Sequence, residues 1–113
     1  MKPNIELHYM HRDSDNWKTR AIRILENPKQ IPVEELRARI KDALIDGDWI
    51  LPNQCGLPAL AGDNWGPGFD DEFHEIETLY ETDKPADIDI SVDEVVARLE
   101  AYYKKYCEMY AHL

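Results

Sequence analysis

Apolar and polar residues alternate along two stretches near the start of the chain. Residues 5–10 place Ile, Leu and Tyr on one face, which is the two-residue period of a half-buried strand. Residues 17–25 show the same pattern, with Lys and Arg interleaved. Because the Asp, Ser and Asn residues at 13–16 favour a turn, the pattern predicts a β-hairpin with its turn at those positions.

The period lengthens to three or four residues after Pro32. The repeating apolar residues, which predict a helix with one buried face, are Val33, Leu36, Ile40 and Leu44. Pro32 suits a first helical turn, and Glu34 and Glu35 favour the positive end of the helix dipole. We expect the helix to end at Asp46–Gly47, since glycine readily takes the left-handed conformation found at helix C-termini.

Proline and glycine then interrupt the chain. Residues 49–52 are long enough only for a small strand, and the density of Pro and Gly from 53 to 68 blocks a continuous helix or strand. Residues 73–80 predict a further strand. Alternation along that strand puts four side chains on one side: His74, Ile76, Thr78 and Tyr80.

A capping box opens the last predicted element. Ser91 and Glu94 have the spacing at which each side chain satisfies a free amide of the other, and Ile90 and Val95 stand at the positions of a hydrophobic staple. The helix that follows should run to the end of the chain. These elements predict a single α+β domain over residues 1–113. It consists of a small antiparallel sheet, made of the hairpin and the later strand, with a middle helix and a long C-terminal helix.

Charge is unevenly placed along the 113 residues, whose formal net charge is −10. Residues 1–45 hold nine basic and seven acidic residues, whereas residues 46–100 hold two basic and fifteen acidic residues, a net of −13. Such a field repels nucleic acid and anionic membranes, and it favours a partner protein with a basic surface. The alternative is that the acidity only keeps a small protein in solution.

The chain shows no membrane or export signal in its sequence. No stretch approaches the roughly 18 apolar residues of a membrane helix, and residues 1–6 lack the apolar core of a secretion signal. We therefore expect a cytoplasmic protein. Cys55 and Cys107 lie far apart and in no metal-binding spacing, so free thiols are expected in that reducing compartment.

The first candidate binding surface lies on the C-terminal helix. Its apolar residues follow a spacing of four, three, four, three and four: Val95, Leu99, Tyr102, Tyr106, Met109 and Leu113. A second line beside it comprises Val92, Val96, Tyr103 and Tyr110. The pattern from Val92 to Leu99 indicates the face that packs on the sheet. The last turns differ because they are rich in tyrosine, which is enriched at interfaces since it combines large area with a hydroxyl. We predict that a partner protein, or a second copy in a homodimer, contacts Tyr102, Tyr103, Tyr106, Met109 and Tyr110.

The acidic stretch at 70–77 is the second candidate. A docking face for Lys and Arg of a partner is predicted from Asp70, Asp71, Glu72 and Glu75. A metal site is the alternative. However, His74 lacks the second histidine four residues on that a zinc protease helix needs, and residues 63–75 do not follow a calcium loop. We expect no metal ligand and no cofactor.

Nucleophiles elsewhere in the chain have no evident base. Cys55 sits beside a glycine in a predicted loop, and nothing in the sequence marks a general base for it. Ser14 and Ser91, the only serines, have sufficient roles in a turn and a helix cap. Glycine-rich phosphate loops and dinucleotide fingerprints do not occur. The sequence therefore predicts a protein that is not an enzyme.

Several segments resemble a group of small uncharacterised bacterial proteins. These segments are Tyr9-Met10-His11-Arg12-Asp13 with Asn16 and Lys18, Ala43-Leu44-Ile45-Asp46-Gly47-Asp48-Trp49, Gly56-Leu57-Pro58-Ala59-Leu60 and Phe73-His74-Glu75. The group shares an aromatic-Arg-Asp-x-x-Asn-x-Lys start, a Leu-Ile-Asp-Gly segment and a His-Glu pair after an acidic loop.

This resemblance covers residues 7–82 and implies a shared fold, with no activity known for the group. It marks a linked set of residues: Arg12, Asp13, Asn16, Lys18, His74 and Glu75. Arg12 or Lys18 pairs with Glu75 in this interpretation if the hairpin lies beside the third strand. A structural ion-pair network explains the set as well as a functional site does.

We expect a small cytoplasmic regulatory domain that occupies the surface of a partner protein through its acidic face and its tyrosine-rich helix. Two other classes stay open. A nucleic-acid mimic would use the acidic segment 46–100 to block a DNA- or RNA-binding protein, which requires charges in paired rows. A metal-dependent or acid–base enzyme would use His74 with the surrounding carboxylates.

Overall fold

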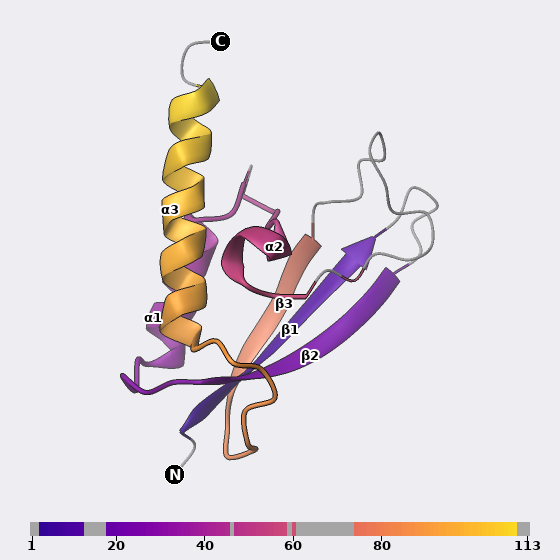
Figure 1. Ribbon diagram of the computed structural model, residues 1–113, viewed down its shortest axis with the longest axis vertical. Helices are drawn as coiled ribbons and strands as arrows, with labels where there is room; N and C mark the ends of the chain where they lie inside the picture. Colours follow the sequence, from indigo (N-terminus) through magenta and orange to yellow (C-terminus); the bar gives the residue numbers. More distant parts are fainter. Residues whose placement is uncertain (1–2, 13–17, 46, 59, 61–73, 111–113) are drawn as a thin grey trace.

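A computed structural model of the chain describes residues 3–12, 18–45, 47–58, 60 and 74–110. The elements in chain order are β1 (Asn4–Arg12), β2 (Lys18–Glu26), α1 (Val33–Asp42), α2 (Pro52–Cys55), β3 (His74–Thr82) and α3 (Val92–Tyr110). The strands form one antiparallel sheet in the order β2-β1-β3, and the helices pack against it, with α3 as the longest (Figure 1). The predicted α+β class, with a hairpin and a later strand in one sheet, is confirmed.

Alternation along β1 decides which face of the sheet is covered. Ile5, Leu7 and Tyr9 have no exposed surface, and they join Leu36 of α1 and Val95 of α3 in one hydrophobic core. Fully burying a side chain of this size contributes about 1.5–3 kcal/mol. The residues between them point to the opposite face of the sheet, as the two-residue period requires.

A bulge in β3 corrects the predicted facing of its side chains. The register between β1 and β3 shifts at Glu77, which has no partner on β1. An extra residue of this kind moves the alternation by one position. His74 and Ile76 therefore face the helices, whereas Thr78 and Tyr80 face the other side of the sheet, where Tyr80 is 50% exposed. The prediction that all four share one side is wrong because it assumed a regular strand.

Helix α1 starts after Pro32 with two glutamates in its first turn, as predicted, but it stops at Asp42. The Ala43 N–H donates to the Ile40 carbonyl (2.9 Å), and this three-residue step tightens and ends the helix. The predicted end at Asp46–Gly47 is therefore too late. Gly47 does adopt a left-handed backbone (φ +78°), but it uses that conformation in the turn that follows the helix.

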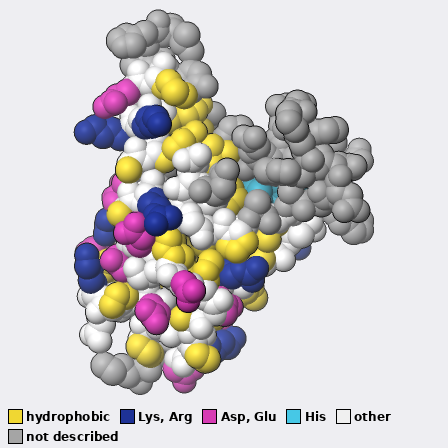
Figure 2. Space-filling view, viewed as in Figure 1, with side chains coloured by type: hydrophobic (Ala, Val, Ile, Leu, Met, Phe, Trp, Pro, Cys, Tyr) yellow, Lys and Arg dark blue, Asp and Glu magenta, His cyan; other side chains and the backbone are white. Residues whose placement is uncertain are grey.

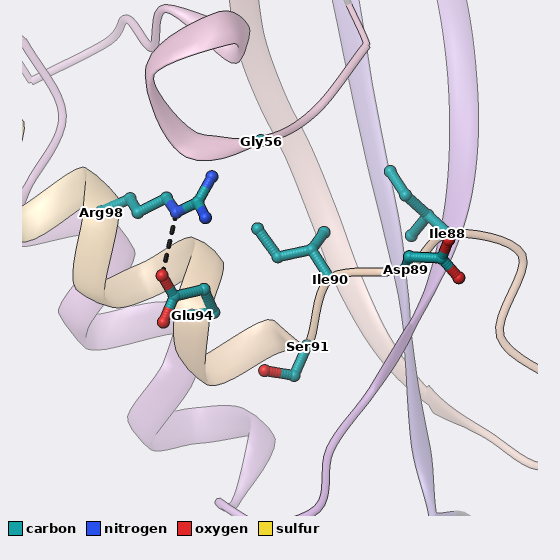
Figure 3. Close-up of a pocket in the computed structure, with 7 residues that line it drawn as sticks. All are labelled: Gly56, Ile88, Asp89, Ile90, Ser91, Glu94 and Arg98. Atoms are coloured by element: carbon teal, nitrogen blue, oxygen red, sulfur yellow. Dashed lines mark hydrogen bonds and ion pairs between the residues drawn. The ribbon is translucent and has the colours of Figure 1, made fainter.

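The segment rich in proline and glycine contains a helical turn that the sequence pattern did not predict. Pro52 opens α2, and Gly56 closes it with a left-handed backbone (φ +88°). The Leu57 N–H donates to the Pro52 carbonyl (3.0 Å). Figure 3 shows Gly56 facing Ile90 and Arg98 near the start of α3. A Cβ at Gly56 would lie 2.4 Å from Ile90 Cδ1, so α2 approaches α3 through a residue without a side chain.

Residues 83–91 lead from β3 to α3 past the outer edge of β2. The Ile24 N–H donates to the Asp87 carboxylate (2.9 Å), and the Asp87 N–H donates back to the Ile24 carbonyl (3.1 Å). A parallel bridge then joins Glu26 to Ser91. This connection therefore covers the second half of the β2 edge with hydrogen-bond partners from its backbone and from the Asp87 side chain.

Helix α3 begins where predicted but without the predicted capping box. The Glu94 carboxylate accepts a hydrogen bond from Arg98 Nε (2.9 Å). Desolvation raises the pKa of Asp93, but hydrogen bonds from the Ser91 hydroxyl and from its own amide, together with the nearby Lys29 ammonium, outweigh it and leave that pKa below its ordinary value. Asp93, rather than Glu94, therefore interacts with Ser91 at the start of the helix. None of the described helices has the length and apolar character needed to cross a membrane.

Candidate partner-binding surface

Burial changes along α3 while its apolar spacing continues. Val92, Val95 and Val96 have no exposed surface, and Leu99 is 4% exposed. Met109, on the same line of the helix as Val95 and Leu99, is 57% exposed. Figure 1 shows the reason, since the last turns of α3 extend past the other described elements. The body of the protein buries the first half of the apolar line and leaves Met109 exposed.

The tyrosines between these two ends are half-buried. Tyr103 packs against the hydrophobic core, and Tyr102 and Tyr106 each keep part of their surface exposed. Figure 2 shows hydrophobic side chains along the flank of α3 that leads to the body. The side chain of Tyr110 lies outside the described part of the structure. We refer to Tyr102, Tyr103, Tyr106 and Met109 as the distal α3 surface.

Charged residues share the exposed remainder of α3. The exposed charged residues are Glu94, Arg98, Lys104, Lys105 and Glu108. The helix therefore stays amphipathic to its last described turn, beyond the point at which the sheet and the other helices cover its apolar side. An amphipathic helix whose apolar side is uncovered is the form that docks into a groove or against a second helix.

Only part of the predicted acidic face lies within the described residues. Asp70, Asp71 and Glu72 fall outside them, and Glu75 is half-buried on β3. Other carboxylates pair with basic side chains of the same chain: Glu6 with Lys84 (3.0 Å), Glu94 with Arg98 (2.9 Å) and Glu100 with Arg39 (2.6 Å). Surface pairs of this kind contribute little to stability because water screens them. Part of the acidity is therefore neutralised within the chain.

One ion pair joins β2 and β3 close to the linked set of the sequence resemblance. The hairpin does lie beside the third strand, with β1 between β2 and β3. Across β1, Arg20 Nε donates to Glu77 Oε1 (3.1 Å). The side chain of Arg12 lies outside the described residues, and Lys18 is exposed at the start of β2. The observed pair joins β2 and β3, the two strands that a Lys18–Glu75 pair would also join.

Strand pairing brings together two histidines that lie far apart in the sequence. His11 and His74 are cross-strand neighbours, both buried, with ring centroids 4.9 Å apart. The Leu60 N–H donates to Nε2 of His74 (3.0 Å), so Nε2 is the unprotonated ring nitrogen. The Tyr9 hydroxyl donates to the Pro58 carbonyl (2.6 Å). These bonds fasten the segment after α2 to the end of the sheet.

The opposite sheet face carries a second cluster that sequence reasoning missed. The His8 ring meets the Tyr80 ring edge-on, with centroids 5.4 Å apart, and His8 Nε2 lies 2.6 Å from Glu6 Oε2. Hydrogen bonds from His8 and then Lys84 hold the pKa of Glu6 below its ordinary value. Ile22, opposite His8 on β2, is 46% exposed. Alternation puts Glu6 and His8 on this face, but only the bulge brings Tyr80 there.

The described residues offer little for metal or thiol chemistry. No group of three or more His, Cys, Asp or Glu side chains within that part of the chain is arranged to hold a metal ion. Cys55 is fully buried and its Sγ donates to the Pro52 carbonyl (3.3 Å). Desolvation raises the pKa of this thiol to about 11, so at neutral pH it is protonated and a poor nucleophile. Cys107 is a free thiol exposed on α3.

Comparison with known proteins adds no relative. No protein-family model matches the chain, and searches of curated proteins and of solved structures find no significant match.

Proposed function

We propose that this chain is a small cytoplasmic domain that regulates a partner protein by occupying its surface through the distal α3 surface. One observation carries the proposal. The apolar line of α3 continues with the same spacing from Leu99 to Met109, while the exposed fraction rises from 4% to 57%. Tyrosine and methionine side chains at the edge of the body supply large, adaptable contact area for a partner. The two free cysteines fit a reducing compartment.

The net charge of the chain indicates the charge of the partner's surface. With a net charge of −10, the domain attracts a basic surface over long range and is repelled by nucleic acid. The candidates for this steering role are the acidic residues Asp70, Asp71, Glu72 and Glu75. Steering raises the association rate, whereas the apolar contact of the helix determines how long the complex lasts.

The nucleic-acid mimic is the weaker alternative. A mimic needs carboxylates free to stand in for phosphates, at the one charge per roughly 1.7 Å that duplex DNA presents. Among the described residues, Glu77, Glu94 and Glu100 are instead engaged by arginines at 2.6–3.1 Å. These internal pairs favour a protein-binding domain with a net acidic field over a rigid row of unpaired charges.

Two double variants of the full chain test the proposal. Tyr102→Ser with Met109→Ser removes contact area from the distal α3 surface and keeps Tyr103 and Tyr106, which make other interactions within the chain. Lys104→Ser with Glu108→Ser is the matched control, because both side chains are exposed in the same turns of α3. Circular dichroism should show the same helix content for both variants.

Light scattering measures self-association, and a pull-down from the native host, read by mass spectrometry over a salt series, measures other partners. We expect the wild type and the control to form a complex that survives high salt, since apolar contacts are not screened. The Tyr102/Met109 variant should lose that complex. The proposal is wrong if both variants bind alike, or if the Tyr102/Met109 variant unfolds and so reveals core residues.

A further inference from the structure

A groove of about 330 Å³ lies between α1 and the outer edge of β3. Ile40 of α1 and Leu79 of β3 are buried in it (3% and 2% exposed), and Leu44 and Ile76 are half-buried. The floor of the groove is therefore mostly apolar. These four residues, with Arg37 and Lys41 on the α1 side, define what we call the α1–β3 groove.

The backbone of β3 faces this groove because β3 is an edge strand. At its start, the N–H and carbonyl of His74 pair outward with Ile50 (2.8 Å each). The backbone N–H and carbonyl of Ile76, two residues further along the strand, point in the same outward direction. The bulge then shifts the alternation, so that Leu79 is the next outward residue, and Arg37 Nη2 donates to its carbonyl (2.6 Å). The amide and carbonyl of Ile76 and the amide of Leu79 are thus directed at the groove.

The other edge of the sheet is closed by the chain itself. On β2, the Ile24 backbone bonds to Asp87, and Arg23 Nη1 donates to the Ile22 carbonyl (3.1 Å). Such devices keep an edge strand from pairing with another chain. On β3, Arg37 caps the Leu79 carbonyl in the same way. Within the described residues, however, no hydrogen bond of this kind covers Ile76, and the apolar groove lies beside it instead.

The charge left free at the groove is positive. Glu77 is engaged by Arg20 at 3.1 Å, whereas the side chains of Arg37 and Lys41 are exposed on α1. This local charge contrasts with the net charge of −10 for the chain. A ligand with a carboxylate near its apolar side chain is therefore complementary to the groove, and a basic ligand is not.

We propose that the α1–β3 groove binds an extended acidic peptide as a fourth strand of the sheet. The peptide backbone pairs with Ile76 and Leu79, an apolar side chain enters the slot between Leu44 and Ile76, and a carboxylate lies beside Lys41. Strand addition next to a helix gives affinity through main-chain bonds and specificity through the side-chain slot. A single extended segment fits between helix and strand, whereas the edge of a folded sheet brings its own neighbouring strands with it.

Peptide selection on the full chain tests this proposal without a known ligand. Random heptapeptides displayed on phage are selected against the immobilised protein, and the enriched peptides are titrated into isotope-labelled protein. We expect enriched sequences to alternate β-branched or aromatic residues with Asp or Glu and to lack proline in the middle. Amide shifts should fall on α1 and on residues 76–79, and hydrogen exchange of the Ile76 and Leu79 amides should slow.

A charge reversal gives the matched comparison. Lys41→Glu should weaken peptide binding by roughly fivefold or more, since an exposed ion pair is lost and a like charge replaces it. Lys104→Glu, the same exposed change on α3, should leave binding unaltered. The proposal is overturned if no peptide enriches, if shifts map to the distal α3 surface, or if both variants behave alike. Protection of the Ile76 amide that depends on protein concentration, without peptide, would assign the groove to a second copy.

Discussion

Gly56 and Gly47 both adopt left-handed backbone angles, φ +88° and +78°, but only Gly56 is packed. A Cβ at Gly56 would meet Ile90 Cδ1 at 2.4 Å, whereas nothing lies within 4 Å of one at Gly47. We expect Gly56→Ala to lower the free energy of unfolding by roughly 2–4 kcal/mol through strain and overpacking. Gly47→Ala should cost only about 1–2 kcal/mol. Urea unfolding followed by circular dichroism measures the free energy of unfolding of both variants. Equal losses would show that α2 and α3 leave room for a methyl group at Gly56.

The two cysteines should differ sharply in reactivity. Cys107 is exposed, whereas Cys55 is buried with a pKa raised to about 11. Because the thiolate is the reactive form, Ellman's reagent at pH 8 should titrate one thiol per folded chain and two in guanidinium. The Cys107→Ser variant should show none until it unfolds. Rapid labelling of a second thiol in the folded wild type would contradict the burial of Cys55.

The same burial predicts a loss of stability in alkali. Folding raises the pKa of Cys55 from 9.0 to about 11 and raises that of Tyr9, in both cases because the charged form is desolvated. A raised pKa means that folding favours the protonated form, so this stability is complete below about pH 9 and is lost as pH rises through about 11. Melting temperatures between pH 8 and 11 should fall, and Cys55→Ala should flatten the fall. An identical slope in that variant would exclude Cys55 as a cause.

Along one element, α3, the cost of shortening an apolar side chain should depend on position. Leu99→Ala removes a buried side chain and should lower the free energy of unfolding by about 2–5 kcal/mol. Met109→Ala, on the same line of the helix, should change it by no more than about 0.5 kcal/mol. Chemical denaturation of both variants measures the difference. A large loss for Met109→Ala would mean that the distal α3 surface is packed within the chain.

The elements that the sequence predicts well are those decided by local periodicity. The alternation in 5–10 and the three- and four-residue spacing after Pro32 give β1 and the start of α1, because each pattern requires only one covered face. The end of α1, helix α2 and the bulge at Glu77 depend on contacts made elsewhere. The turn of α2, for instance, is fixed by the fit of Gly56 against Ile90, which no local pattern contains.

The candidate surface was only half predictable for a similar reason. Helical spacing identifies which side of α3 is apolar, but it does not tell how far the rest of the protein extends along that side. The tyrosines distinguish the distal half of α3 from its packed first half in the sequence, but the exposed fractions of Leu99 (4%) and Met109 (57%) follow only from the fold. In the same way, the proximity of His11 and His74 follows from the register of β1 and β3, which requires the whole sheet.

At the scale of the whole molecule, the segregated charge should act on the rate of association. Replacing Asp70, Asp71 and Glu72 by their amides should slow binding to the partner recovered by pull-down, mainly in the on-rate. The difference should shrink as salt is added, because charges are screened over about 8 Å at physiological ionic strength. Stopped-flow mixing at low and high salt measures this. An unchanged on-rate at low salt would show that the acidic residues of this stretch serve only solubility.

The central place of β1 in the sheet also has a consequence for biosynthesis. Leu7 lies opposite Leu79, so β1 leaves the ribosome about 70 residues before the strand that becomes its second neighbour. At roughly 5–20 residues per second, this interval lasts on the order of 4–14 s. During this interval, the nascent hairpin exposes Ile5, Leu7 and Tyr9 because neither β3 nor α3 is yet present to cover them. We expect the growing chain to be most vulnerable to chaperone capture and to mispairing in those seconds, before translation reaches the residues that close the sheet.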